Sequence, residues 1–281
     1  RNLFGLYGTF TPTLKKGLKE YLSKEGTKKI MCTYDKIPSL VSLIIPKEYR
    51  LLVDEYHNLL KIYSYRKEAV EGVLEHFNEF KSYCFMSATP IAMDFKPDAL
   101  KDVEEYIADW KHIEPLTILP YKTNRAYMLT ANLIKAYQRE GYIKKDELKS
   151  YEAYFFINSV TEIKKILEYT HLTNDDCRII CADEDKNRRT LGEYQISSST
   201  DAPKKFNFIT SKSFEGVDFY SETGICYVVS NIHNEHTLLS VDMDIPQIAG
   251  RIRNTNNPFR NLVVHIFNTR PSDYYSDYEK A

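Results

Sequence analysis

The sequence predicts an α/β fold with parallel sheets, arranged as two tandem domains. Short, evenly apolar runs recur along the chain, stretches with helical periodicity separate them, and the same alternation begins again in the second half. Strands that are apolar on both faces are typical of a parallel sheet covered by helices. A length of 281 residues, 43% of them hydrophobic, is enough for one large or two medium cores.

The first half alternates strands with helices up to a polar turn. Residues 13–24 place Leu14, Leu18, Tyr21 and Leu22 on one face, with lysines opposite, which predicts a helix. The other expected elements are strands at 29–33, 49–53 and 83–86, a short helix or apolar connector at 37–43, helices at 64–80 and 100–110, and an extended piece at 115–119. Turn chemistry at 120–125 places the domain boundary between residues 120 and 121.

The second half repeats this alternation from residue 121 to residue 281. Helices are expected at 126–139, 161–169 and 245–252, and strands at 153–158, 178–182, 206–210, 224–229 and 261–267. Between them lie a charged stretch at 184–189 and a polar loop at 197–203, and the tail from residue 271 is polar and rich in tyrosine. Two α/β units in tandem fit this pattern.

Charge and cysteine content limit the classes of function. The formal net charge is −1, so nucleic-acid binding would need a local basic surface or backbone dipoles. The five cysteines are scattered without a second pair or a histidine cluster, which favours reduced thiols in a cytoplasmic protein over a zinc site. No apolar run approaches the length of about 20 residues that spans a bilayer, so no membrane role is expected.

Two motifs follow the expected strands of the first half. Asp54-Glu55-Tyr56-His57 follows an apolar run, and Ser87-Ala88-Thr89-Pro90 follows the next one about thirty residues later. Paired acids after a buried strand suit a site for Mg²⁺ and a nucleotide. One carboxylate can hold the metal through water, and the next can orient the attacking water.

Two further motifs lie in the second half, and each has a simpler explanation when taken alone. Glu215-Gly216-Val217-Asp218 follows the strand that ends at Thr210; acids here can order ribose hydroxyls or hold arginines, or the segment is only a glycine turn. A helix over 247–254 would place four residues on one side: Gln247, Gly250, Arg251 and Asn254. Its arginines can reach phosphoryl oxygens, or the helix is only a basic surface helix.

Taken in order, these motifs resemble those of superfamily 2 helicases and translocases. Residues 54–57 resemble motif II of the DExH type, 87–89 motif III, 154–158 the place of motif IV, 210–218 motif V and 247–253 motif VI. Thr33-Tyr34-Asp35 resembles a first-domain motif that lines the nucleic-acid track. The resemblance covers nearly the whole chain and implies two RecA-like P-loop NTPase domains, 1–120 and 121–281, with ATP between them.

The resemblance also implies roles for individual residues. Asp54 would hold Mg²⁺ through water, Glu55 would be the general base, and His57, Ser87 and Thr89 would couple the γ-phosphate to domain movement. Gln247 would sense that phosphate and Arg251 would be the arginine finger. Glu215, Gly216, Asp218 and Gly250 would lie at the nucleotide face, and Thr33 and Thr210 would contact the nucleic-acid backbone.

The sequence departs from the family pattern in two places. The last arginine of motif VI falls one residue early, at Arg253, with Asn254 in the usual position; the second finger is therefore Arg253 in altered geometry, or it is absent. No Gly-x-x-x-x-Gly-Lys-[Ser/Thr] loop occurs, and Gly5-Leu6-Tyr7-Gly8-Thr9 has neither the lysine nor the spacing. We therefore expect a fragment that lacks the first strand and the P-loop, has an incomplete first domain, and hydrolyses little or no ATP.

The leading interpretation is an ATP-dependent DNA helicase or translocase, with DNA favoured over RNA because the Asp-Glu-x-Asp pattern of RNA helicases is absent. One alternative is the motor part of a restriction or nuclease system, which would need a nuclease segment elsewhere. Another is a non-catalytic nucleic-acid-binding protein of helicase fold. An upstream P-loop in the gene would exclude this last alternative.

Overall fold

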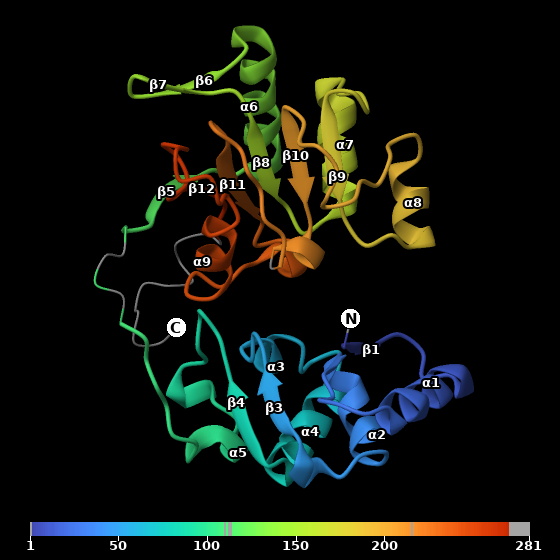
Figure 1. Ribbon diagram of the computed structural model, residues 1–281. Coiled ribbons are helices and arrows are strands. Elements are labelled where there is room, and N and C mark those ends of the chain that lie inside the picture. The colour runs from blue at the N-terminus through green and yellow to red at the C-terminus, as the bar shows by residue number, and fades with distance from the viewer. Residues whose placement is uncertain (1, 110, 112–113, 215, 270–281) are drawn as a thin grey trace. The chain divides into compact units, whose positions relative to one another are not determined.

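The computed structural model describes residues 2–109, 111, 114–214 and 216–269. They form two compact units, Arg1–Ala108 and Asp109–Ala281 (Figure 1). This division lies earlier than the boundary expected at residue 120, because β5, Thr117–Lys122, pairs along its whole length with β12, Leu262–Phe267. Residues 117–120 therefore belong to the sheet of the second unit.

The first unit holds its described strands in two separate parallel pairs. β1, Phe4–Leu6, pairs with β2, Ile30–Cys32, while β3, Arg50–Val53, pairs with β4, Ser82–Phe85. Its α-helices are α1 (Pro12–Ser23), α2 (Ile37–Val41), α3 (Asn58–Lys61), α4 (Lys67–His76) and α5 (Asp98–Lys101). The glycine-containing segment 5–9 thus forms β1 and the turn after it.

Local sequence explains where the helices of the first unit begin and which face they bury. The Thr11 hydroxyl accepts a hydrogen bond from the Leu14 amide at 3.2 Å and caps α1, with Pro12 in the first turn, where a missing N–H costs nothing. α4 buries Val70 and Val73 against Val53, which ends β3. This contact places α4 behind the strand that leads into the acidic motif.

The helix expected at residues 100–110 is wrong over most of its length. α5 ends at Lys101, and residues 104–109 have no helical structure. Tyr106 and Ile107 are 83% and 87% exposed, so this segment has no surface on which to bury an apolar stripe. A short helix without tertiary packing is only marginally stable. Trp110, the last residue of the expected helix, lies outside the described residues.

The strands of the first unit are less covered than a buried parallel sheet requires. Leu52 on β3 is 59% exposed and Tyr83 on β4 is 40% exposed. The expectation of parallel strands is confirmed here, but the expectation of two covered faces is not met for these two strands.

The second unit is built on a six-stranded parallel sheet, in the order β5-β12-β11-β8-β10-β9. Its remaining strands are β8 (Ala153–Phe156), β9 (Cys177–Ile180), β10 (Phe206–Ile209) and β11 (Ile225–Ser230), and its helices are α6 (Ala126–Glu140), α7 (Val160–Thr170), α8 (Asp185–Leu191) and α9 (Asp244–Ala249). The order in the sheet differs from the order in the chain, and helices connect most of the strands, as in α/β folds.

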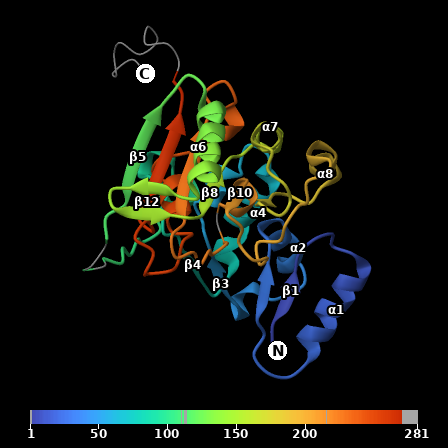
Figure 2. The same ribbon diagram turned by 90° about the horizontal axis from the view of Figure 1, so that it is seen from above.

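Alternate side chains of the sheet pack on opposite faces. Phe155 and Tyr227 pack with Ile134 of α6 and with α7 on one face. Figure 2 shows α6 lying along this side of the sheet. Phe156 and Val228 pack with Ile248 of α9 on the other. The strands are apolar on both faces because helices cover both faces.

Two elements of the second unit were absent from the expectations. β6, Ile143–Lys145, and β7, Leu148–Ser150, form an antiparallel hairpin after α6. The charged stretch at 184–189 lies in α8. No helix among the described residues combines the length and the apolar character that crossing a bilayer requires.

Candidate active site

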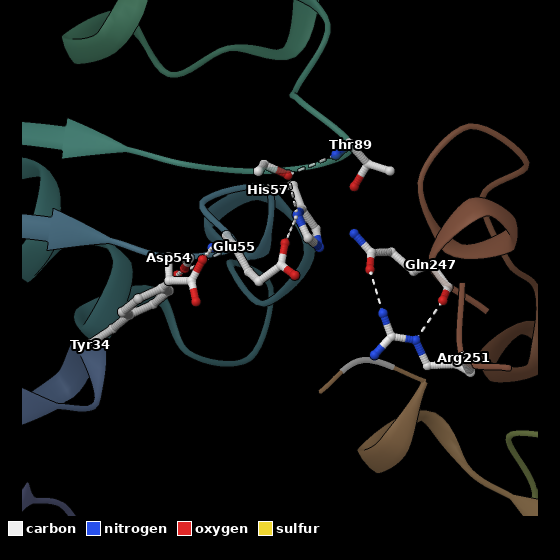
Figure 3. Close-up of polar contacts among 8 residues, drawn as sticks. Tyr34, Asp54, Glu55, His57, Thr89, Gln247 and Arg251 are labelled. Atoms are coloured by element: carbon white, nitrogen blue, oxygen red, sulfur yellow. Dashed lines mark hydrogen bonds and ion pairs between the residues drawn. The ribbon is translucent and has the colours of Figure 1, made fainter. Parts of the chain in front are cut away.

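The acidic motif forms a tight turn directly after β3. The Met86 amide donates to the Val53 carbonyl at 2.8 Å, and the Tyr56 amide donates back to the Met86 carbonyl at 3.0 Å. These bonds fasten residues 54–57 to the chain that leaves β4. Asp54 is exposed, and its Oδ1 atom accepts a hydrogen bond from the Glu55 amide at 3.1 Å (Figure 3).

Glu55 occupies a strained backbone conformation. Its φ is +48°, in the left-handed region, which costs an L-residue about 1–2 kcal/mol. Such strain persists where surrounding contacts fix the backbone, and it concentrates at functional sites. The buried Oε2 atom of Glu55 lies 3.3 Å from His57 Nδ1 and has no hydrogen-bond partner among the described residues. This oxygen therefore has capacity for a further hydrogen-bond donor.

His57 connects the acidic motif to the Ser-Ala-Thr motif. Its Nδ1 atom lies 2.7 Å from Ser87 Oγ, and the tautomer decides which atom donates (Figure 3). Ser87 Oγ also accepts a hydrogen bond from the Thr89 amide at 3.0 Å. The structure thus brings His57, Ser87 and Thr89 together at the ends of two neighbouring parallel strands.

The acids of this turn fit a magnesium ion that is held mainly by water and phosphate. Among the described residues, no cluster of three or more His, Cys, Asp or Glu side chains is arranged to hold a metal. Mg²⁺ commonly keeps several waters and binds one or two carboxylates together with the phosphates of its nucleotide. The exposed carboxylate of Asp54 meets that need.

In the second unit, backbone hydrogen bonds join the segments that resemble motifs V and VI. The Phe219 amide donates to the Arg251 carbonyl at 2.7 Å, and the Arg253 amide donates to the Phe219 carbonyl at 2.8 Å. Gly216 has a φ of +71°, so the expected tight glycine turn is confirmed. Glu215 lies outside the described residues.

Asp218 and Gln247 hold the two arginines. Arg253 Nε donates to Asp218 Oδ1 at 2.8 Å, and Arg251 Nη1 lies 3.8 Å from the same oxygen. Arg251 Nε donates to the Gln247 carbonyl at 2.7 Å and Nη2 to Gln247 Oε1 at 3.4 Å (Figure 3). The helix expected at 245–252 ends at Ala249, so Arg251 follows α9, and its guanidinium is oriented by Gln247 of α9 and by Asp218.

Gly250 and Asn254 lie next to these arginines in the chain, and each has its own local surroundings. A Cβ atom built on Gly250 would meet its nearest neighbour at 3.6 Å, an ordinary van der Waals contact. The Asn254 side chain accepts a hydrogen bond from the Asn256 amide at 3.0 Å and shapes the following turn. The position that usually holds the last arginine of motif VI thus has a local structural role.

The two threonines expected at the nucleic acid have different surroundings. Thr33 follows β2 and is exposed, while Thr210 follows β10 and is 6% exposed. The Thr210 hydroxyl and amide both donate to the Ile180 carbonyl, at 3.3 and 3.0 Å. Contact of Thr210 with a phosphate stays a prediction, and its hydroxyl would have to leave this carbonyl.

Sequence reasoning placed Asn158 at the end of the segment that resembles motif IV but gave it no role, whereas its side chain joins three loops at the carboxyl edge of the second sheet. Its Oδ1 accepts from the Ser211 amide at 3.2 Å, and its Nδ2 donates to the His236 carbonyl at 2.6 Å. A polar residue at the end of the apolar run 153–157 was the available signal.

Three of the five cysteines are buried thiols. All five are unpaired with one another, and Cys177, Cys181 and Cys226 are buried. Burial raises the pKa of Cys177 and Cys226 to about 12, so these thiols stay protonated at neutral pH. A protonated thiol is neither a nucleophile nor a metal ligand.

Comparison with known proteins supports the fold. No protein-family model and no curated protein matches the sequence. Among solved structures, the chain is similar to the DEAD-box helicase Mss116 bound to ssRNA and UDP-BeF, with a TM-score of 0.54 and 13% identity over 95% of this chain and 53% of that one. The fold is RecA-like. The chain spans about half the length of this neighbour.

Two other DEAD-box proteins superpose too loosely for a detailed comparison. The yeast splicing factor Prp28 has a TM-score of 0.32 and 14% identity, over 95% of this chain and 55% of that one. A DEAD box protein from the hyperthermophile Methanococcus jannaschii has a TM-score of 0.35 and 14% identity, over 96% and 67%. At these identities the similarity concerns the fold alone.

Proposed function

We propose that this chain carries the acidic and arginine motifs of an ATP-hydrolysing superfamily 2 helicase or translocase of the DExH type. One observation carries the proposal. The strained acidic turn after β3 is joined, by the 2.7 Å contact between His57 Nδ1 and Ser87 Oγ, to the Ser-Ala-Thr motif after the neighbouring parallel strand. The RecA-like fold supports the same activity.

The residues would divide the reaction between the two domains. When bound, Mg²⁺ would polarise a phosphoryl oxygen, and Asp54 would hold the ion through water. Glu55 would take the proton from the attacking water. Arg251 would exchange its contact with Gln247 for phosphate oxygens, and Arg253 would assist from Asp218.

The remaining residues would transmit the state of the nucleotide. His57, Ser87 and Thr89 would change their hydrogen bonds when the γ-phosphate leaves, and Gln247 would sense that phosphate. The nucleotide face would include Glu215, Gly216, Asp218 and Gly250. The two motor domains expected at 1–120 and 121–281 belong to the same proposal, with β5 counted in the second domain.

The nucleic acid is proposed to be DNA, with RNA tested beside it. The absence of the Asp-Glu-x-Asp pattern favours DNA, whereas the structural neighbour Mss116 was solved with single-stranded RNA. Thr33 and Thr210 would contact the backbone of the strand. Such contacts position the nucleic acid without reading its sequence.

Hydrolysis assays test the proposal. ATP hydrolysis is measured with and without single-stranded DNA or RNA, for the 281-residue chain and for the product of the complete open reading frame that encodes it. We expect the complete product to hydrolyse ATP with nucleic-acid stimulation, and Glu55→Gln to lower kcat by about 10²–10⁴-fold while nucleotide still binds. Glu75→Gln, on the exposed face of α4, is the matched control.

A non-catalytic nucleic-acid-binding protein is the second candidate, because the 281 residues contain no phosphate-binding loop. If the complete product binds DNA or RNA but hydrolyses no nucleotide, this second candidate replaces the motor. Full activity of the Glu55→Gln variant would remove Glu55 as the base.

A further inference from the structure

The hydroxyl of Tyr34 reaches the acidic turn from a different part of the first unit. Tyr34 begins a short 3-10 turn, Tyr34–Lys36, immediately after β2. Its hydroxyl donates to the Asp54 carbonyl at 2.6 Å, and the Glu55 carbonyl lies 3.3 Å from the same oxygen (Figure 3). Twenty residues separate the donor from the first of these carbonyls.

This contact falls on the strained peptide of the turn. Glu55 has a φ of +48°, and the Asp54 carbonyl belongs to the peptide group that precedes it. A left-handed residue keeps its conformation only where neighbouring groups over-determine it. On the other side of the turn, the Tyr56 amide donates to Met86 and the Asn58 amide donates to the Glu55 carbonyl. Tyr34 adds a hydrogen bond to this turn from a segment that belongs neither to the turn nor to the neighbouring strand.

The hydrogen bond of Tyr34 also connects the acidic turn to the segment that contains Thr33. Tyr34 follows Thr33, which is exposed and is one of the residues proposed to contact the nucleic acid. A rigid phenol ring then joins that segment to the backbone of the proposed general base. Movement of residues 33–36 would change the direction of the Glu55 side chain, because the Asp54 carbonyl is held by the phenol.

We propose that Tyr34 is a positioning residue, whose hydroxyl holds Glu55 in its left-handed conformation and makes its orientation depend on residues 33–36. This inference rests on the proposed function for its catalytic consequence. Its structural part, the restraint of residues 54–58, stands on the hydrogen bonds alone.

The test compares Tyr34→Phe with Tyr21→Phe. Phenylalanine keeps the ring and removes only the hydroxyl. Tyr21 is a matched control because its hydroxyl also lies near two backbone carbonyls of the first unit, Lys29 at 3.0 Å and Asn2 at 3.3 Å, away from the acidic turn. Hydrogen–deuterium exchange of the 281-residue chain reports on the amides of Tyr56 and Asn58.

We expect Tyr34→Phe to speed exchange of these two amides on the order of tenfold and Tyr21→Phe to leave them unchanged, because one hydrogen bond to the turn is lost. Unchanged exchange in Tyr34→Phe would overturn the inference. Equal acceleration by both variants would overturn it as well, since that result describes a general loosening of the unit.

A kinetic comparison in the complete gene product tests the catalytic consequence. We expect Tyr34→Phe to lower kcat about tenfold and to weaken stimulation by nucleic acid, with KM for ATP unchanged, because the carboxylate is displaced while nucleotide contacts remain. A rise in KM with unchanged kcat would contradict this part. If the wild-type product hydrolyses no nucleotide, the proposed function fails, whereas the exchange experiment still decides whether Tyr34 restrains the turn.

Discussion

At the scale of single residues, the proposed base occupies a backbone conformation that its residue type disfavours. Glu55 has a φ of +48°, and glycine is the residue that adopts such a conformation without steric cost. A carboxylate at this position therefore lowers the stability of the first unit. Stability alone would favour glycine at this position, whereas the proposed activity requires a carboxylate.

Because of the strain at Glu55, we expect glycine to be more stabilising than alanine at this position, the reverse of their usual order in a helix. We expect Glu55→Gly to have a free energy of unfolding about 1 kcal/mol higher than Glu55→Ala, because alanine keeps the left-handed strain and glycine removes it. Chemical denaturation of the two variants measures the difference. At Glu75, exposed within α4, the order is expected to be normal, with alanine the more stable by about 1 kcal/mol. If alanine were the more stable substitution at both positions, backbone strain at Glu55 would be contradicted.

At the scale of elements, parallel strands collect the functional side chains at their carboxyl ends. β3 and β4 bring Glu55, His57 and Ser87 together in the first unit. β8 and β10 bring Asn158 next to Ser211 in the second. Loops at this edge are held by side chains of neighbouring loops, so one substitution there can shift several segments.

β12 carries a half-buried histidine that makes stability depend on pH. Burial lowers the pKa of His265, whose Nε2 atom lies 3.0 Å from Ser230 Oγ on β11. In the unfolded chain the pKa returns to about 6.5. The unfolded state therefore binds a proton at a higher pH than the folded state does, and stability falls as pH decreases below about 6.5.

We expect the urea midpoint of the second unit to decrease when the pH is lowered from 7.5 to 5.5. The decrease should be smaller in the His265→Gln variant. Fluorescence or circular dichroism in urea at the two pH values provides the measurement. His233→Gln, at an exposed histidine, serves as the control and should leave the pH dependence unchanged. Equal pH dependence in wild type and His265→Gln would show that another group is responsible.

At the scale of the whole molecule, the two units differ in how completely their strands are covered. Every residue of β8, β10 and β11 is buried, whereas Leu52 on β3 is 59% exposed and Tyr83 on β4 is 40% exposed. Apolar area left in water contributes no hydrophobic stabilisation, which amounts to about 25 cal/mol per Å² when the area is buried. The first unit is therefore expected to be the less stable of the two.

This difference predicts that the units unfold separately, the first unit before the second. Hydrogen exchange of the whole chain in increasing urea should release the amides of β3 and β4 at lower urea than those of β8 and β11. A single cooperative transition, with all four strands exchanging together, would show that the units unfold as one. If the two units do unfold separately, residues 109–281 expressed alone should reproduce the second transition.

Most elements and the α/β class could be predicted from the sequence, because they depend on local periodicity. The strands at 153–158, 206–210 and 224–229 were expected within one or two residues of β8, β10 and β11. The helix expected at 100–110 failed because its apolar residues find no surface to cover. The hairpin at β6 and β7 was missed because its strands are three residues long.

The sequence by itself determined the alternation of elements, the acidic turn after β3 and the order of the motifs, since spacing along the chain encodes each of these. Only the tertiary structure decided which distant residues meet: Ser87 contacts His57, and the Tyr34 hydroxyl donates to the Asp54 carbonyl. The physical reason is range. Periodicity is a property of neighbouring residues, whereas a contact between residues 20 or 30 positions apart depends on how the strands pair. It also depends on backbone conformations such as the left-handed one of Glu55, which a glutamate does not predict.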